Sequence, residues 1–275
     1  MQRIESINDP RVAAYRNLPD RTLRGESVFV AEGLLLTQRL LESSHETESV
    51  FVTDDYAEEF RRRVPAGVPV YVAAEELLLE VVGFNFHRGA LALGRRRLSQ
   101  SVEQLLASKA LSEGIQLVIC PEITKPENMG LVFRTAAGFG LDGVVLGERC
   151  CDPFSRRSMR VSMGAVLNVP YVKSQDLLSD LKALRERWDV ELWATVLDAT
   201  ADRIDQVVWP RRIGVLMGNE FEGLGMRWLA ACQRKVTIPV TSAVDSLNLG
   251  VAAGIFLYEM THPRQGRKGV GEAAK

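Results

Sequence analysis

The chain has 275 residues, of which 46% are hydrophobic, and a formal net charge of −1. This length favours two domains over one, and the hydrophobic content suffices for two cores. The near-zero charge argues against capture of nucleic acid by overall charge and leaves only local basic patches for that task. There is no run of about 18 apolar residues and no apolar signal-peptide core, so we expect a cytoplasmic protein without membrane contact.

The cysteines and histidines exclude several kinds of site. The four cysteines form no CxxC pair and have no histidine near them, which predicts free thiols rather than a zinc site or a disulfide framework; they are Cys120, Cys150, Cys151 and Cys232. The three histidines all lie outside residues 115–258; they are His45, His87 and His262. A histidine-based catalytic triad or metal site within 115–258 is therefore excluded, and we expect no metal.

Residues 1–98 predict a small α/β domain. Apolar periodicity predicts helices over 33–44, 54–63 and 75–82, and strands over 50–53, 68–72 and 90–94. Alternation of strands and helices at this spacing predicts a sheet covered by helices. The stretch from 94 to 114 is charged and then weakly amphipathic, so we place a linker at residues 99–112.

Residues 113–262 predict a second α/β domain, followed by a flexible tail over 263–275. Strands are predicted over 115–120, 143–147, 169–172 and 191–198, and helices over 129–139 and 176–188. Asn128 is the predicted cap of the helix over 129–139, and Gly140 suits its left-handed end. This repeated βα pattern predicts a mostly parallel sheet.

The stretch from 211 to 260 contains two further strands that run directly into polar turns. IGVLM leads into GNEFEGLG (213–225), and KVTIPV (235–240) leads into SAVDSLNLGVAAGIFLYEM (242–260), which predicts a helix capped around Ser242, Asp245 and Ser246. Such turns lie at the carboxyl edge of a parallel sheet, where open α/β sheets bind ligands. Gly250 and Gly254 indicate either a close backbone crossing or ordinary tight helix packing.

Three segments in this order carry a family resemblance. ENMGLVFRTAAGFG (127–140), VLMGNEFEGL (215–224) and IPVTSAVDSLNLGVAAGIFLYE (238–259) resemble the ordered motifs of the SpoU/TrmH branch of the SPOUT RNA methyltransferases. The resemblance covers about residues 115–260. The segments INDPRVAAYRNL and FVAEGLLLTQRLLE are similar to the RNA-binding accessory domain of that family, which is ribosomal-protein-like and of α/β/α build. Phe221, Met226 and Gly250 depart from the usual residues of the motifs.

The resemblance implies a SPOUT α/β domain with a deep carboxyl-terminal trefoil knot, a topology that composition alone could not indicate because knots are nearly absent from proteins. It further implies that S-adenosyl-L-methionine binds in the knot, held largely by backbone groups of the turns. By motif position, the cofactor contacts fall at Thr195, Gly218, Ile238 and Leu247.

The implied reaction is methyl transfer to a ribose 2′-hydroxyl of RNA, with ribosomal RNA favoured over transfer RNA. Arg134 matches an arginine that the family places near the attacking hydroxyl, as a base or as a clamp. A guanidinium is essentially never deprotonated in proteins, so we favour the clamp. The polar positions around it match Asn128, Glu220, Ser246 and Asn248.

Each polar position also has a purely structural interpretation. Asn128 would cap its helix, Ser246 and Asn248 would accept helix amides, and Glu220 would brace its turn. Two alternative functions stay open: a transfer-RNA 2′-O-methyltransferase, and an RNA-binding or assembly factor that keeps the knot without turnover.

RNA contacts and a homodimer complete the expectations. The cluster of Arg156, Arg157 and Arg160 follows the strand over 143–147, which predicts a place on the same sheet edge as Arg134 and contacts with phosphates. The alternative is a solvated arginine face. The small-residue face of 246–260 and the apolar face of 129–139 predict a homodimer.

Overall fold

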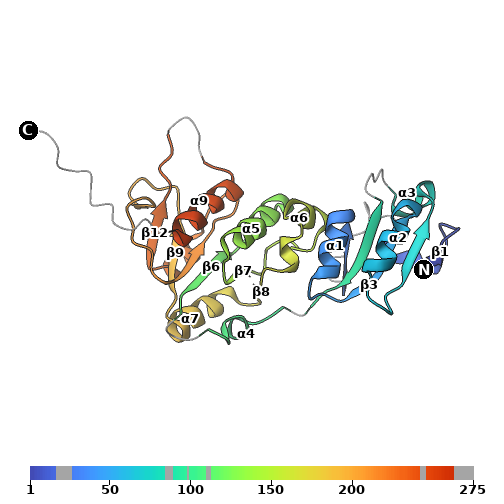
Figure 1. The fold of residues 1–275 in the computed structure, drawn as a ribbon. Coiled ribbons are helices and arrows are strands. Elements are labelled where there is room, and N and C mark those ends of the chain that lie inside the picture. Colours follow the sequence, from blue (N-terminus) through green and yellow to red (C-terminus); the bar gives the residue numbers. More distant parts are fainter. Residues whose placement is uncertain (17–26, 84–88, 98, 110–112, 242–245, 263–275) are drawn as a thin grey trace, which may run out of the picture. The chain divides into compact units, whose positions relative to one another are not determined.

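The computed structural model describes residues 1–16, 27–83, 89–97, 99–109, 113–241 and 246–262 (Figure 1). The chain forms two compact units. The first contains residues 1–99, 125–134 and 151–168, and the second contains residues 100–124, 135–150 and 169–275. The first unit thus combines the amino-terminal part with two segments that come from later in the sequence.

A mixed sheet of five strands forms the centre of the first unit. The order is β1 (Gln2–Arg3), β4 (Val70–Ala73), β3 (Thr47–Thr53), β5 (Ala90–Arg95) and β2 (Val28–Glu32). The β1–β4 and β3–β4 pairs are parallel, whereas β5 runs antiparallel to β3 and β2. Helices α1 (Leu34–Glu42), α2 (Asp54–Arg63) and α3 (Glu75–Val82) accompany the sheet, and a 3-10 helix spans Pro10–Tyr15.

The later segments add α6 (Arg156–Val161) and a 3-10 turn (Ala165–Leu167) to the first unit. Phe154, which precedes α6, packs against Phe29 of β2 and His45, with ring centroids 4.7 and 5.4 Å away. Arg96 fixes the same region because its guanidinium donates to both carboxylate oxygens of Asp152, at 2.9 and 2.7 Å. These contacts make the region around α6 an integral part of the first unit.

The second unit is built on a seven-stranded sheet in which every described pair is parallel, as the βα repeat predicts. The order is β10 (Asp202–Arg203), β12 (Arg234–Thr237), β9 (Glu191–Thr195), β11 (Arg212–Leu216), β6 (Ile115–Cys120), β7 (Gly143–Leu146) and β8 (Tyr171–Lys173). All the turns that follow these strands therefore leave from one edge of the sheet.

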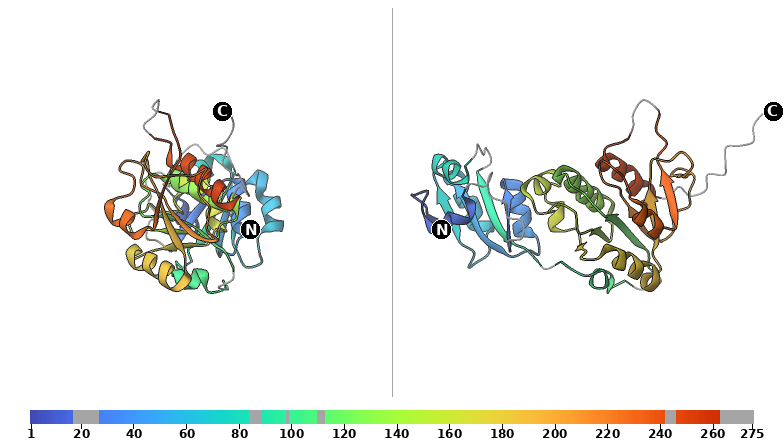
Figure 2. Two further views of the ribbon diagram at one scale, coloured as in Figure 1. Left: turned by 90° about the vertical axis from the view of Figure 1, so that its left-hand side faces the viewer. Right: turned by 180° about the vertical axis from the view of Figure 1, so that it is seen from behind.

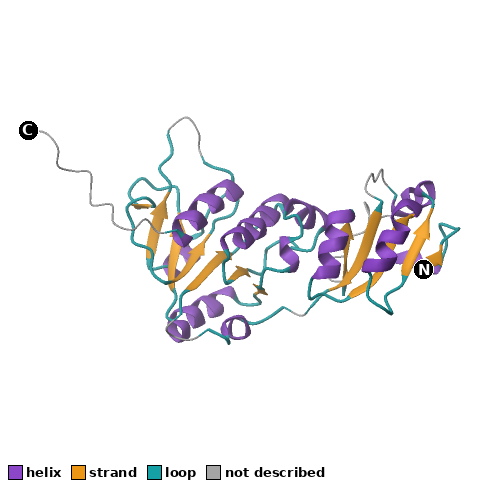
Figure 3. Cartoon of the chain, in the orientation of Figure 1, coloured by secondary structure: helices purple, strands orange, loops and turns teal. Residues whose placement is uncertain are grey.

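Helices cover this sheet on both faces (Figures 2 and 3). Ile115, Leu117 and Ile119 of β6 point into a core with α4 (Val102–Leu106), α7 (Leu177–Trp188) and α8 (Met226–Ala231). Gln116 points to the opposite face, where its amide donates to the Met260 carbonyl of α9 (Leu249–Thr261) at 3.3 Å. Helix α4 lies inside the predicted linker, yet its buried residues belong to this core.

Two predicted helix starts are wrong. Helix α5 spans Pro126–Phe139, so Asn128 lies in its first turn instead of capping it; Pro126 starts the helix because its fixed φ suits the first helical position. Helix α9 begins at Leu249 and its cap is Asn248, not Ser246. The other predicted cap residues, Ser242 and Asp245, lie outside the described residues, as does the predicted tail over 263–275. Gly140 ends α5 with φ +67°, as predicted.

None of the described helices is both long enough and apolar enough to span a bilayer. No disulfide joins any of the four cysteines, and Cys120 and Cys150 are buried.

Candidate active site

The turns at the carboxyl edge of the second sheet are tied to one another. The Thr195 hydroxyl at the end of β9 donates to the Leu216 carbonyl at the end of β11, at 2.9 Å. The amide of Met217 donates to the Ile119 carbonyl of β6 at 2.8 Å. The residues that follow β9, β11 and β6 are therefore held in fixed register at this edge.

The turn after β11 is rigid. The Asn219 side-chain oxygen accepts the amides of Phe221 and Glu222, at 2.9 and 2.6 Å, and the Asn219 amide donates to the Gly223 carbonyl at 3.1 Å. A Cβ on Gly218 would lie 2.6 Å from backbone atoms of Gly223, so any larger residue at 218 would force this turn open. The predicted cofactor residue Gly218 thus sits where only glycine fits.

Glu220 connects two turns, whereas its predicted structural interpretation was to brace its own turn. Its carboxylate accepts the hydroxyl and the amide of Thr124 at 3.2 and 3.4 Å, which connects the turn after β11 to the turn after β6. Sequence reasoning missed Asn219 and Thr124. Asn219 could have been found from its place directly before Glu220 in the glycine-rich turn, since asparagine commonly accepts amides two residues on.

The remaining predicted cofactor positions follow β12. Ile238 directly follows that strand, and Leu247 directly precedes the cap of α9; both are half-buried. Because β12, β9 and β11 are neighbours, Ile238, Thr195 and Gly218 come at the same edge of three adjacent strands. Residues 242–245, between Ile238 and Leu247, lie outside the described residues.

The structure gives a helix-capping role to Asn248 but not to Ser246. Asn248 caps α9, because its side-chain oxygen accepts the amides of Gly250 and Val251 at 2.9 and 3.4 Å. Ser246 is exposed and lies two residues before this cap. The structural interpretation of Asn248 is therefore confirmed, and that of Ser246 as a cap is wrong.

Asn128 and Arg134 lie on α5 within the first unit, whereas Glu220, Ser246 and Asn248 belong to the second. Asn128 is 2% exposed, and Arg134 is exposed. Among the residues that the structure describes, no carboxylate forms an ion pair with Arg134. Its guanidinium is thus accessible to an anionic ligand.

The three arginines of the cluster differ in their ion-pair partners. Arg156 donates to the Glu32 carboxylate at 2.9 and 2.7 Å, and Arg160 lies 3.3 Å from its other oxygen; Glu32 is only 7% exposed. Arg157 pairs on the surface with Glu127 at 2.8 Å. The Arg156–Glu32 pair stabilises the contact of α6 with β2, so Arg157 is the member that best fits a ligand-binding role.

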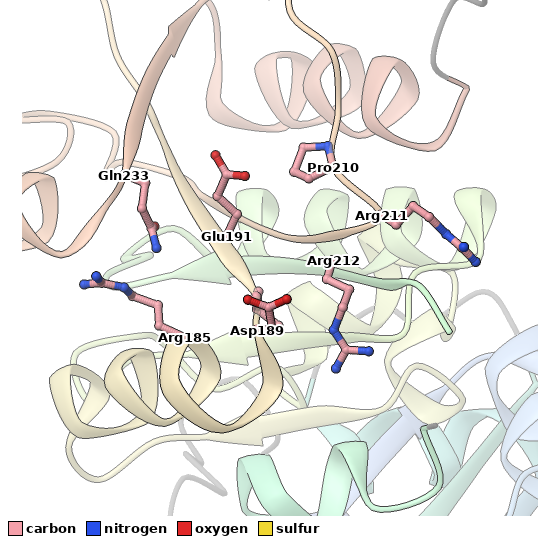
Figure 4. Close-up of a pocket in the computed structure, with 8 residues that line it drawn as sticks. Arg185, Asp189, Glu191, Pro210, Arg211, Arg212 and Gln233 are labelled. Atoms are coloured by element: carbon pink, nitrogen blue, oxygen red, sulfur yellow. The ribbon is translucent and has the colours of Figure 1, made fainter. Parts of the chain in front are cut away.

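A polar hollow of about 330 Å³ lies at the opposite edge of the second sheet (Figure 4). It lies where β9 and β11 begin. The residues that line it include Arg185, Asp189, Glu191 and Gln233. Gln233 accepts the Leu192 amide and Glu191 accepts the Trp193 indole N–H, so these groups serve the fold. None of the predicted site residues lines this hollow, and ligands of parallel sheets bind at the other edge.

The described residues include no group of three or more histidine, cysteine, aspartate or glutamate side chains that could hold a metal ion. The turns described above offer backbone amides and carbonyls, the hydroxyls of Thr195 and Thr124, and the Glu220 carboxylate. Such a set suits an organic ligand with several hydrogen-bonding groups.

Comparison with known proteins identifies the family. The sequence model of the SpoU rRNA Methylase family matches residues 116–258, which is most of the second predicted domain and includes all of the predicted site positions. An uncharacterised tRNA/rRNA methyltransferase of Mycobacterium bovis is 34% identical, over 92% of this chain and 89% of its own. The 23S rRNA (guanosine-2′-O-)-methyltransferase RlmB of Bordetella pertussis is 31% identical, over 73% of this chain and 81% of its own.

Solved structures agree with the sequence relatives. The crystal structure of the AdoMet-bound rRNA methyltransferase from Sinorhizobium meliloti is similar with a TM-score of 0.79 and 26% identity, over 95% of this chain and 97% of that one. The α/β architecture is therefore that of SPOUT methyltransferases. The chain belongs to the SpoU rRNA methylase family.

Proposed function

We propose that this protein transfers the methyl group of S-adenosyl-L-methionine to a ribose 2′-hydroxyl of ribosomal RNA. The observation that carries the proposal is the set of interlocked turns after β6, β9 and β11, which falls on the residues that the family match covers. Two of the related proteins are named 23S rRNA (guanosine-2′-O-)-methyltransferases, and this supports ribosomal RNA as the substrate and the 2′-hydroxyl as the position.

The carboxyl edge fits S-adenosyl-L-methionine. The cofactor carries an adenine ring, a ribose and an amino acid, and it supplies an electrophilic methyl group on a sulfonium. The turns after β9, β11 and β12 offer backbone groups at Thr195, Gly218 and Ile238, and Leu247 adds an apolar surface. Leu197 and Val240, 66% and 39% exposed, follow β9 and β12 and provide apolar contacts for a flat ring.

Arg134 is the catalytic residue in this proposal. Its accessible guanidinium would hold the ribose or its phosphate and stabilise the negative charge that develops on the oxygen as the hydroxyl proton passes to solvent water. Alignment of the hydroxyl oxygen with the methyl carbon and the sulfur is the main task, since the sulfonium releases a neutral thioether, which is a good leaving group. Asn128, Glu220, Ser246 and Asn248 are proposed to position these groups, although Asn248 and Glu220 also support the local fold.

The topology and domain organisation belong to the same proposal. We place a trefoil knot in the carboxyl-terminal part of residues 113–262, an RNA-binding accessory domain in residues 1–98 and the linker in residues 99–112. A cytoplasmic location suits a ribosomal RNA substrate.

Transfer RNA is the second candidate substrate, because the mycobacterial relatives carry both RNA classes in their descriptions. Mapping 2′-O-methyl sites in total RNA from a strain that lacks this protein separates the two. Loss of one methylation in ribosomal RNA is expected. Loss in transfer RNA alone would assign the substrate to the other class.

A non-catalytic assembly factor is the remaining alternative. Calorimetric titration with S-adenosyl-L-methionine tests it, because an enzyme must bind its cofactor at or near the concentration found in cells. Saturable binding with one site per chain is expected. A protein that binds RNA but not the cofactor would be an assembly factor.

A further inference from the structure

One large aromatic side chain is exposed at the carboxyl edge of the second sheet. Phe221 is 76% exposed, in the middle of the turn that follows β11. Burial of a phenylalanine side chain contributes about 1.5–3 kcal/mol to folding, and Phe221 forgoes most of that contribution. Its neighbour in the turn, Leu224, packs against the core of the second unit, so the turn has an apolar anchor without Phe221.

The backbone that carries Phe221 is fixed in advance. The Asn219 side chain accepts the Phe221 amide at 2.9 Å, and Gly223 adopts φ +68° to close the turn. Glu220, the preceding residue, is held by Thr124. An aromatic ring on a rigid support loses little conformational freedom when a ligand stacks on it, which favours binding.

The surroundings of Phe221 fit a nucleobase better than a protein partner. A stable protein interface buries about 800 Å² on each partner, and the turn offers only Phe221 and Met226 as exposed apolar side chains. One ring face is sufficient for one unpaired base, because sequence-specific RNA recognition stacks bases on aromatic side chains. Phe221 is also three residues from Gly218, which we assign to the cofactor.

From this geometry we propose that Phe221 stacks on an unpaired base of the RNA substrate, beside the nucleotide that receives the methyl group. The inference rests on the proposed function and adds to it a residue that binds a base instead of a phosphate. The substrate is then an RNA whose target nucleotide lies in a loop or bulge, where a neighbouring base can leave its stack.

The test compares four variants of the full-length protein for binding to a short single-stranded oligoribonucleotide and to an unmodified ribosomal RNA transcript. Phe221→Ala and Phe221→Leu remove the ring, Phe221→Trp keeps one, and Met226→Ala removes an equally exposed apolar side chain. Loss of one base stack is expected to weaken binding by about five-fold or more in the first two variants. Phe221→Trp and Met226→Ala should bind as the unchanged protein does.

Salt dependence and oligomeric state provide independent readouts. Stacking involves no counterion release, so Phe221→Ala should leave the slope of log Kd against log salt unchanged. Equal RNA binding by Phe221→Leu and Phe221→Trp would overturn the proposal, since an apolar contact without stacking would then suffice. A shift of Phe221→Ala to a smaller species in sedimentation would assign Phe221 to a protein interface instead.

Failure of the proposed function is distinguishable from failure of this inference. If the unchanged protein binds neither S-adenosyl-L-methionine nor RNA, the methyltransferase proposal is wrong. If it binds both and Phe221→Ala retains full RNA affinity, only the role of Phe221 is wrong.

Discussion

At the scale of single residues, we propose that Arg134 carries the chemistry. We expect Arg134→Ala to lower the methylation rate by about a hundred-fold or more, as loss of a group that stabilises developing negative charge does in other enzymes. Because Arg134 is exposed, the free energy of unfolding should change by less than about 0.5 kcal/mol. Single-turnover assays and thermal unfolding measure the two effects. Unaltered turnover would remove Arg134 from the site.

Gly218 and Gly225 form a matched pair in the same turn. A Cβ at Gly218 would collide with the Gly223 backbone at 2.6 Å, whereas one at Gly225 would meet nothing within 4 Å. We expect Gly218→Ala to cost about 1–3 kcal/mol of stability and to weaken cofactor binding at least ten-fold, because the backbone of the turn must move. Gly225→Ala should cost less than about 1 kcal/mol and leave cofactor affinity unchanged. Calorimetry that finds equal affinities would show that Gly218 does not line the cofactor site.

At the scale of structural elements, the buried Glu32 connects β2 to α6. Arg156→Ala leaves this carboxylate with Arg160 as its ion-pair partner among the described residues, which should cost about 1–3 kcal/mol. Arg157→Ala breaks only an exposed pair and should change stability by less than about 0.5 kcal/mol. Chemical denaturation compares the two. Equal stabilities would mean that the Glu32 pair does not hold α6 in place.

The same two variants separate structure from RNA binding. Arg157→Ala should reduce the slope of log Kd against log salt by about one, because one phosphate contact is lost. An unchanged slope for Arg157→Ala would return the cluster to the solvated-surface interpretation. Arg156→Ala alone would not be informative about RNA binding, because a destabilised fold and a lost phosphate contact would both weaken that binding.

We expect His45 to make the contact between β2 and the region before α6 sensitive to pH. Burial, the largest cause, lowers the pKa of His45 below its usual value of 6.5; the nearby Arg97 charge lowers it further, and the hydrogen bond to the Arg95 carbonyl opposes both. The unfolded chain therefore takes up the proton more readily. The contribution of neutral His45 to stability is complete above about pH 6.5 and is lost as the pH falls. His45→Phe should show less acid destabilisation in urea titrations; an identical pH dependence would contradict this assignment.

The accuracy of the predicted elements follows from their length and surroundings. Strand β6 and helices α2 and α3 have the predicted bounds, because each is a clear periodic run between breakers. The two-residue strands β1 and β10 carry no periodicity of their own and form only where a longer neighbour supplies the hydrogen bonds. The start of α9 was misplaced because Ser242, Asp245, Ser246 and Asn248 are all good cap residues, and local pattern does not rank them.

Prediction of the candidate site from local sequence pattern is limited in the same way. The turns that contain Gly218 and Glu220 could be found from the sequence, since strands that end in polar turns indicate the carboxyl edge of a sheet. The Arg156–Glu32 pair could not, because its partners are 124 residues apart and only the fold brings them together.

At the scale of the whole molecule, we propose a homodimer. Val251 and Tyr258 are 52% and 49% exposed on one face of α9, and Gly254 between them has no atom within 4 Å of an added Cβ. Neither of the two interpretations of Gly254, a close backbone crossing or tight helix packing, is seen at this residue in the described part of the chain, which leaves the face open to a second copy. Phe139 of α5 extends the apolar surface, with its ring centroid 5.9 Å from that of Tyr258.

Charge placed on this face should separate the dimer. We expect Val251→Asp to sediment as a monomer at micromolar concentration, while Val208→Asp, a change at an 86% exposed loop valine, leaves the dimer intact. A monomeric unchanged protein, or two variants that behave alike, would contradict the proposed interface.

The central claim is methyl transfer to a ribose hydroxyl of ribosomal RNA. The most direct measurement incubates the protein with unmodified ribosomal RNA and S-adenosyl-L-methionine labelled in its methyl group, then digests the RNA to nucleosides. We expect label in a single 2′-O-methylnucleoside, incorporated about a hundred-fold or more slowly by the Arg134→Ala variant. Label on a nucleobase, or no label with a protein that binds both cofactor and RNA, would contradict the claim.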